Sequence, residues 1–364
     1  MTATTETHAS LEDLPRRSAA LSRVAFGGLI VALVLAFLLS LALGSVQIPL
    51  DQVVRVLAGG DAARDSWTKI VLTYRLPKAL TAVLAGAALA VSGLQMQTFF
   101  RNPLADPSIL GINAGASLGV AAVVLSAKTV AANTLLANLD VPGHLGLVAS
   151  ATIGAALVLV VVMVLARYVN TLTLLILGMM IGYLTNAVVS VLLYFSIADQ
   201  VRAYVSWTFG SFASVTWRQM PVLAVASLVG LCLAFLLIKW LNAFLLGEGY
   251  AQSMGMPVRR ARLWVVINSA LLAGTVTAFC GPIGFLGVAV PHLCRALWGT
   301  ADHRILIPAS ALMGAALALL ADLAAQMPGS ATVLPLNAIT ALLGAPVVIW
   351  VILRRTPMRA GGGW

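Results

Sequence analysis

Residues 24–44 read VAFGGLIVALVLAFLLSLALG, a stretch in which no side chain carries a charge. A helix needs about 20 mainly apolar residues to cross a bilayer. This stretch is long enough, and no small-residue cleavage site of the A-x-A kind closes it, so a retained membrane helix is favoured over a signal peptide.

Similar apolar stretches recur along the rest of the chain. Only 9% of the 364 residues are charged, whereas a soluble domain carries about 25%, and the mean hydropathy is +0.99. A soluble enzyme is therefore excluded. The sequence predicts an all-α, polytopic membrane domain over residues 23–355 with about ten transmembrane helices. They are expected at 24–44, 76–98, 108–127, 145–166, 172–196, 220–243, 263–280, 282–298, 305–324 and 333–353.

The basic residues indicate how these helices are oriented. Loops on the same side as the two termini hold most of the Lys and Arg residues, so the positive-inside rule places both termini, with tails at 1–22 and 356–364, in the cytoplasm. In a membrane protein this explains the net charge of +10 without a nucleic-acid partner. The three cysteines show no CxxC spacing, so neither disulfides nor a zinc site is predicted.

Glycines and prolines predict close helix packing and kinks. Gly111, Gly115 and Gly119 recur every four residues, and Gly178 and Gly182 repeat the pattern in a later helix, which allows backbones to approach closely. We expect breaks in the later helices, which are tolerated only where the freed backbone groups are buried or line a wet cavity. The residues that would cause them are Pro282, Pro291, Pro335 and Pro346.

Several kinds of chemistry have no residues to perform them. No lysine follows a glycine, so the chain lacks a Walker A sequence to hold nucleotide phosphates. An ion-coupled carrier should place acids deep in the bilayer, yet only Asp322 lies within an apolar stretch, and we interpret it as a helix-to-helix hydrogen-bonding residue. A metal or nucleophilic site is disfavoured, because nothing fixes the geometry of its nearest candidates, His292, Cys294, Asp302 and His303.

Ten short motifs punctuate the helices in a fixed order. They are RLPKAL (75–80), SGLQMQ (92–97), RNPLADP (101–107), LGINAGAS (110–117), LGE (246–248) with SMGM (253–256), GPIGFLG (281–287), PHLCR (291–295), DHR (302–304), LLADLAAQ (319–326) and LGAP (343–346). In this order and spacing the chain resembles the FecCD-type permeases, the membrane subunits of ABC importers for iron-siderophores, haem and cobalamin.

The resemblance implies a transport subunit rather than an enzyme. It implies ten helices per permease, a second permease copy in a homodimer or a heterodimer, two cytoplasmic ABC ATPase subunits and an extracytoplasmic substrate-binding protein. No cofactor is expected in this chain, because ATP and Mg would bind the partner ATPase. The implied location is the cytoplasmic (inner) membrane, as a multi-pass protein in the lipid bilayer.

The resemblance also assigns roles at the cytoplasmic side. The LGE segment of the family seats a short helix in a groove of the ATPase, which implies coupling contacts at Gly247, Glu248, Ala251, Met254 and Gly255. The family's cytoplasmic gate is formed at the turns that enter the third and fifth helices, and it corresponds here to two pairs of residues. They are Asn102 with Leu104, and Thr171 with Leu172, where the apolar Leu172 departs from the polar residue expected.

Outer docking and pathway residues follow in the same way. Arg75 and Lys78 match basic positions that hold the binding protein in the family, although Lys78 is more often arginine, which pairs bidentately with carboxylates. A further family arginine corresponds here to Gln326. We hypothesise that Arg55, Arg64 and Lys69 compensate. The implied pathway-lining residues are Met179, Tyr183 and Asn186, for which ordinary packing is the alternative.

The most favoured function is therefore an ABC importer permease for a ferric siderophore. Haem and cobalamin are the alternatives, since no residue of the chain selects among these cargoes. A different class, an ion-coupled secondary transporter, would have to depend on Asp322. A membrane enzyme is least favoured, because no acid, base and nucleophile converge.

Overall fold

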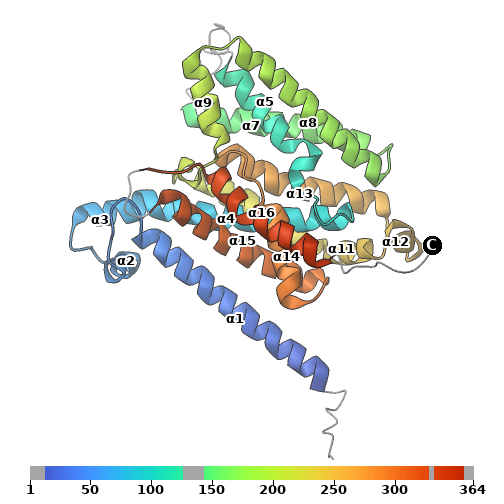
Figure 1. The fold of residues 1–364 in the computed structure, drawn as a ribbon, viewed down its shortest axis with the longest axis horizontal. Helices are drawn as coiled ribbons and strands as arrows, with labels where there is room; N and C mark the ends of the chain where they lie inside the picture. Colours follow the sequence, from blue (N-terminus) through green and yellow to red (C-terminus); the bar gives the residue numbers. More distant parts are fainter. Residues whose placement is uncertain (1–12, 126–142, 328–331, 356–364) are drawn as a thin grey trace, which may run out of the picture.

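The computed structural model describes residues 13–125, 143–327 and 332–355, and every regular element in these ranges is helical (Figure 1). The tail predicted at 356–364 and most of the one predicted at 1–22 lie outside the described residues. The helices are α1 (Asp13–Ala42), α2 (Leu50–Leu57), α3 (Asp65–Lys69), α4 (Leu76–Phe99), α5 (Ile112–Val124), α7 (Gly143–Leu165), α8 (Thr171–Tyr194), α9 (Ala198–Thr208), α10 (Met220–Leu236), α11 (Ile238–Leu245), α12 (Glu248–Ser253), α13 (Val258–Cys280), α14 (Leu286–Trp298), α15 (His303–Gln326) and α16 (Leu336–Arg355). Short 3₁₀ turns span Pro107–Leu110 and Phe212–Ser214.

Helix α4 is the centre of the larger of two helix groups. It packs against α10, α13, α14 and α15, and nearly all its side chains from Ala85 to Phe99 are buried. The helix is longer than the sequence predicted, because it continues α3 through a π-helical turn, Ile70–Arg75, into the expected outer loop. Pro77 does not end it, since a proline in the first turn of a helix breaks no hydrogen bond.

Two glycine pairs set how closely the helices of this group approach. A Cβ added at Gly86 would overlap the carbonyl oxygen of Gly314 in α15, and one at Gly93 would overlap that of Gly287 in α14. Only hydrogen atoms fit between these backbones. Close backbone approach is a common source of stability between membrane helices, where the hydrophobic effect contributes little.

Helices α5, α7, α8 and α9 form the second group, drawn above the first in Figure 1. Gly115 and Gly119 pack against α7, as predicted: a Cβ at Gly115 would lie 2.6 Å from the carbonyl oxygen of Gly154. Gly178 likewise packs against the carbonyl of Ile109. Gly182 has nothing within 4 Å, so the packing prediction is wrong for this glycine within the chain.

Each predicted apolar stretch contains a helix, but not all are long enough to span a membrane. Six helices of the described residues pass by length and hydropathy, and a seventh span is obtained if α10 and α11, bent by 55°, count as one. Helix α5 is shorter, with 13 residues, as is α14. The structure therefore shows a multi-pass helical protein, while the count of ten and the orientation of the termini stay predictions.

The prolines act in two different ways. Pro291 and Pro346 lie inside α14 and α16, as predicted. Pro282 and Pro335 do not interrupt helices; they precede α14 and α16. The reason is local: Gly281 and Phe285 adopt positive φ angles, 75° and 67°, so the chain between α13 and α14 is extended rather than helical.

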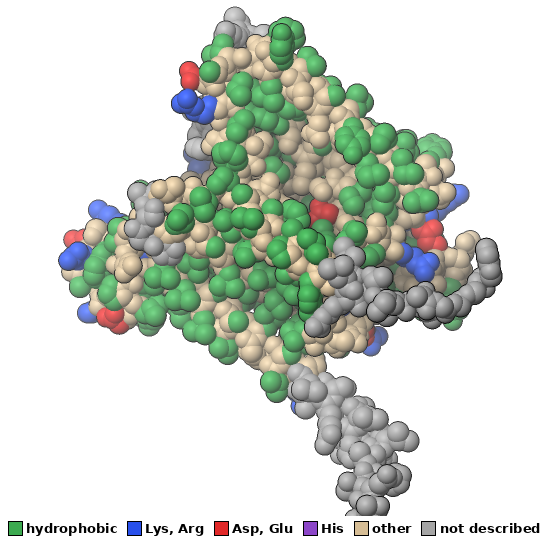
Figure 2. Space-filling model, viewed as in Figure 1, with side chains coloured by type: hydrophobic (Ala, Val, Ile, Leu, Met, Phe, Trp, Pro, Cys, Tyr) green, Lys and Arg blue, Asp and Glu red, His purple; other side chains and the backbone are tan. Residues whose placement is uncertain are grey.

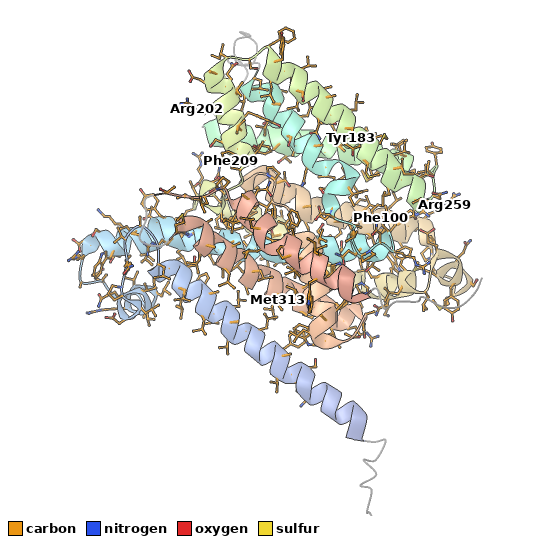
Figure 3. The ribbon with its side chains drawn as sticks, viewed as in Figure 1. Phe100, Tyr183, Arg202, Phe209, Arg259 and Met313 are labelled. Carbon is orange, nitrogen blue, oxygen red and sulfur yellow. The ribbon has the colours of Figure 1, made fainter. Side chains whose placement is uncertain are left out.

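Charged side chains gather at opposite ends of the molecule. In Figure 2 they lie over α2, α3 and α9 on the left and near α12 on the right, with hydrophobic side chains over most of the surface between. Figure 3 labels Arg202 on α9 and Arg259 at the α12 end. This distribution matches a hydrocarbon layer between two aqueous faces.

Candidate functional site

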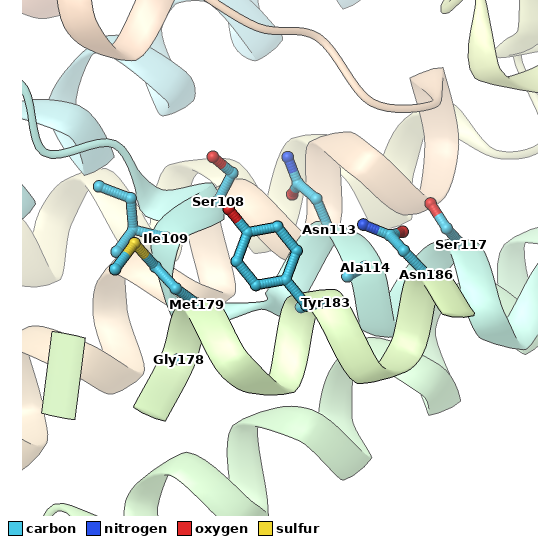
Figure 4. A pocket seen from close by; sticks show the side chains of 10 residues that line it. Ser108, Ile109, Asn113, Ala114, Ser117, Gly178, Met179, Tyr183 and Asn186 are labelled. Atoms are coloured by element: carbon cyan, nitrogen blue, oxygen red, sulfur yellow. The ribbon is translucent and has the colours of Figure 1, made fainter. Parts of the chain in front are cut away.

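A pocket of about 340 Å³ lies between α8 and the Pro107–Val124 region (Figure 4). The three residues predicted to line a pathway, Met179, Tyr183 and Asn186, all border it. Their spacing of three to four residues places them on one face of α8. The structure thus places all three predicted residues at one pocket, and their role in a pathway stays a prediction.

The residues of the opposite wall of the pocket were not predicted from the sequence. It consists of Ser108, Ile109, Asn113, Ala114 and Ser117, from the turn before α5 and from α5 itself. The i, i+4 spacing of Asn113 and Ser117 within LGINAGAS was the available signal. Among the described residues, none that lines the pocket is charged, and the polar groups there are hydroxyls and amides.

Asn113 also ties this wall to the central helices. Its Oδ1 accepts a hydrogen bond of 2.9 Å from the hydroxyl of Thr277 in α13. The side chain is therefore held in place before any ligand arrives.

At the opposite end from α2 and α3, the LGE segment forms α12. Gly247 precedes it with a φ angle of 100°, a conformation that favours glycine, and Gly255 follows it with a φ of 81°. Ala251 is fully buried, whereas Tyr250 and Met254 are exposed. The small helix thus presents an aromatic and a thioether side chain outward between two turns that require glycine.

Glu248 joins α12 to the first turn of α8. One carboxylate oxygen accepts a hydrogen bond of 2.6 Å from the Thr171 hydroxyl, and the other pairs with Arg262 at 2.7 Å. Arg262 also donates to the carbonyl of Val169, at 2.9 Å. A predicted coupling residue and a predicted gate residue are therefore in direct contact. Arg262 was missed, because the sequence counted it only as a cytoplasmic charge.

The other predicted gate residues lie on exposed turns. Asn102 accepts a hydrogen bond of 2.9 Å from the backbone N–H of Leu104, which shapes the turn after α4. Leu104 and Leu172 are both exposed, at 45% and 69%. Nearby, burial raises the pKa of Asp106, while the hydrogen bonds from Ser108 act in the opposite direction. The gate assignment of these residues stays a prediction.

Arg75 differs from the sequence expectation. It is buried, and its guanidinium donates to the carbonyls of Leu41 and Ala42, at 2.8 and 2.9 Å, and to that of Val46. The carbonyls of Leu41 and Ala42 end α1 and have no partner within the helix, whereas Val46 lies beyond it. Arg75 is buried because the long α1 brings its end onto this side chain, and the assignment of Arg75 to docking stays a prediction.

Lys78 and Gln326 converge on Asp322. The Lys78 ammonium lies 3.0 Å from one carboxylate oxygen, and the Gln326 amide donates to the other at 2.7 Å. Asp322 is therefore a helix-to-helix residue, as interpreted, but through an ion pair that the sequence did not predict. The sequence assigned Lys78 to docking of the binding protein. In the structure its ammonium group is paired with the Asp322 carboxylate.

The remaining basic residues of the outer segment are exposed. Arg55 lies on α2, and the Arg64 guanidinium stacks over the ring of Trp67, 4.9 Å from its centroid. Lys69 is exposed as well. Their proposed role in docking stays a prediction.

The cluster near the DHR motif is structural. His303 is fully buried; its ring nitrogens bond the Thr98 hydroxyl and the Asn242 amide oxygen, at 2.8 and 2.7 Å. His292 contacts the carbonyl of Pro103. Among the described residues, no group of three or more His, Cys, Asp or Glu side chains could hold a metal ion.

Comparison with known proteins agrees with this geometry. The model of the FecCD transport family matches residues 32–354. The chain belongs to this family. It is 37% identical to the vitamin B12 import system permease protein BtuC of Klebsiella pneumoniae, covering 90% of this chain and 92% of the relative. It is also 37% identical to the hemin transport system permease protein HmuU of Yersinia pestis, covering 92% and 98%.

A solved structure shows the same fold. It is a metal-chelate type ABC transporter in an inward-facing conformation, with a TM-score of 0.79 and 29% identity over 91% of this chain and 99% of the other. The chain is thus an ABC transporter permease of the FecCD family and a multi-pass membrane protein. Permeases of this kind work with an ATPase and a substrate-binding protein, and they form dimers.

Proposed function

We propose that this chain is the permease subunit of a binding-protein-dependent importer that carries a ferric siderophore across the cytoplasmic membrane. Two copies form a homodimer around the pathway, and two ATPase subunits bind on the cytoplasmic side. ATP and Mg bind the ATPase, so transport requires no covalent chemistry in this chain. Both termini face the cytoplasm in this arrangement.

The observation that carries this proposal is the uncharged polar pocket between α5 and α8. Hydroxyl and amide groups can hydrogen-bond to a chelate in passing without the strong attraction that a buried charge would exert. A pathway of this kind must release its cargo, because the external binding protein supplies the affinity. Histidine, a common iron ligand, is not among the lining residues.

The apolar surface around the pocket supports dimerisation. Large side chains of α8, among them Ile176, Met180 and Leu184, are 46–68% exposed in the single chain. A second copy that covers this face would complete the pathway wall. Since 340 Å³ is at the lower end for a small-molecule site, one chain alone encloses little of such a chelate.

Haem or cobalamin is the second candidate cargo. The two relatives named above, at 37% identity over nearly the whole chain, are described as hemin and vitamin B12 permeases. Tyr183, with its hydroxyl at the pocket, is the lining side chain that could interact with a porphyrin metal.

The experiment is ATP hydrolysis and cargo uptake with the chain reconstituted in liposomes, together with its cognate ATPase. Binding protein is added empty, or loaded with ferric siderophore, haem or cobalamin. We expect the siderophore-loaded form alone to stimulate hydrolysis severalfold and to deliver cargo. Stimulation by the haem or cobalamin form would replace the cargo assignment. Failure of any ATPase to associate, with uptake driven by an ion gradient, would refute the importer.

A second test separates the importer from an ion-coupled carrier. Asp322→Asn should leave uptake within about twofold of wild type, because Asp322 bonds only within the helix bundle. It should lower the free energy of unfolding by about 2 kcal/mol, since Lys78 loses a charged partner. The double variant with Lys78→Gln should regain much of this stability. Abolished uptake in a folded Asp322→Asn protein would favour the carrier.

A further inference from the structure

A second, larger cavity lies at the end of the molecule that holds α12. It measures about 690 Å³ and is bordered by the turn between α7 and α8, by α12 and by the start of α13. Its lining includes Arg167, Arg259 and Arg260, together with Tyr168. Figure 3 shows Arg259 at this end of the molecule.

The charge of this cavity is unbalanced. Its one acidic lining residue is Glu248, and both of its carboxylate oxygens are engaged by Thr171 and Arg262. Within residues 13–125, 143–327 and 332–355, the ion pairs are Lys78–Asp322 and Glu248–Arg262. Three exposed arginines therefore border the cavity without an acidic partner in the described chain. Guanidinium groups pair readily with phosphate.

A separate, apolar groove is bordered by residues nearer the middle of α7 and α13. It measures about 390 Å³, lies between α7, α10 and α13, and is lined almost entirely by carbon. Its lining includes Ala156, Leu159, Ile267 and Leu271. On α13 the helical repeat places Ile267 and Arg260, seven residues apart, on the same side, and Arg167 lies two residues beyond the end of α7 at Leu165. The two hollows thus lie along one α7–α13 seam.

The dimensions of the seam match one leaflet of a bilayer. Arg260 and Leu271 are eleven residues apart on α13, which corresponds to about 16 Å of helix. Half of a typical hydrocarbon core is about 15 Å. Between the two hollows, Trp264 is 47% exposed, and Tyr168 is 81% exposed beside the arginines. Tryptophan and tyrosine prefer the membrane interface.

We propose that this seam binds an anionic phospholipid, with the phosphate of its headgroup among Arg167, Arg259 and Arg260 and an acyl chain in the α7–α10–α13 groove. The basic end is the one predicted to face the cytoplasm. Basic pockets between membrane helices on that side bind anionic headgroups. The site is separate from the α5–α8 pocket and does not depend on the cargo. The lipid would also brace α13 beside Arg262, which holds Glu248.

The test is native mass spectrometry of the purified full chain with phosphatidylglycerol and phosphatidylcholine of identical acyl chains. Phosphatidylglycerol should be retained at least tenfold better. Each arginine near the surface adds about a fivefold factor in affinity, so the variant Arg167→Gln/Arg259→Gln/Arg260→Gln should bind phosphatidylglycerol about 100-fold more weakly. The matched control is Arg55→Gln/Arg64→Gln/Arg202→Gln, which removes the same charge from other exposed sites and should bind like wild type.

Two further arms separate the parts of the site. Ala156 is exposed, so Ala156→Trp should fill the groove without disturbing the core, and phosphatidylglycerol retention should fall severalfold. Free glycerol phosphate should not compete at millimolar concentration. Equal retention of the two lipids, or unchanged retention in the arginine variant, would refute the proposal. So would an arginine variant that keeps the lipid but no longer binds the ATPase, because the arginines would then face that partner.

Discussion

Replacing Thr171 with valine is expected to reduce cargo uptake at least tenfold, while ATP hydrolysis by the assembled transporter continues. Valine has the shape of threonine but lacks the hydroxyl that donates to Glu248 at 2.6 Å. Hydrogen bonds to charged groups contribute about 1.5–3 kcal/mol, which corresponds to a factor of about 10 to 100 in an equilibrium. Without this bond, displacement of α12 by the ATPase is transmitted to α8 less completely.

The measurement is cargo taken up per ATP hydrolysed in liposomes. Thr173→Val is the matched control, since it makes the same change two residues further along α8 without touching Glu248. Arg262→Gln should reproduce the uncoupling, because Arg262 orients the same carboxylate. If uptake per ATP is unchanged in Thr171→Val, the contact between Glu248 and Thr171 is structural only.

Replacing Gly93 with alanine should lower the free energy of unfolding by about 3 kcal/mol, at the upper end for an overpacked core. The added methyl group would overlap the carbonyl of Gly287, which is backbone and cannot rotate away as a side chain can. Helices α4 and α14 would have to separate, and α4 would lose contacts with the helices that surround it. Expression of folded protein should fall accordingly.

The measurement is the thermal midpoint of the purified chain in detergent, together with its yield as a monodisperse species. Gly27→Ala in α1 serves as the control, because nothing lies within 4 Å of the added methyl group. It should be neutral or gain up to about 1 kcal/mol from helix propensity. Equal midpoints for the two variants would contradict the packing described here.

Hydropathy was enough to place the long apolar helices, but not α2, α3, α9 and α12, which lie outside the predicted stretches. Each apolar stretch became a helix, because a backbone in lipid must satisfy its hydrogen bonds within itself. Boundaries failed where the local pattern was ambiguous: a span was expected at residues 76–98, yet a π-helical turn carries one helix from Asp65 to Phe99. The polar character of residues 65–75 gave no sign of this continuity.

Long-range pairing was the part that the sequence did not contain. Arg75 and Lys78 appeared equivalent as neighbouring cations. In the structure Arg75 donates to a carbonyl at the end of α1, whereas Lys78 pairs with Asp322, far along the chain. Neither is exposed, because α1 ends on the first and α15 supplies the partner of the second. Likewise, Arg262 acquired its role only when α13 came to lie beside the turn before α8.

The sequence by itself determined the membrane class and the all-helical fold, because these depend on composition and periodicity, and its motifs carried the resemblance to the family. The tertiary structure decided which polar residues meet. It brought Thr171 to Glu248, and it gathered α5 and α8 around one uncharged pocket. Contacts between residues distant in sequence depend on helix packing, which is set by close steric fit at positions such as Gly86 and Gly93 rather than by hydropathy.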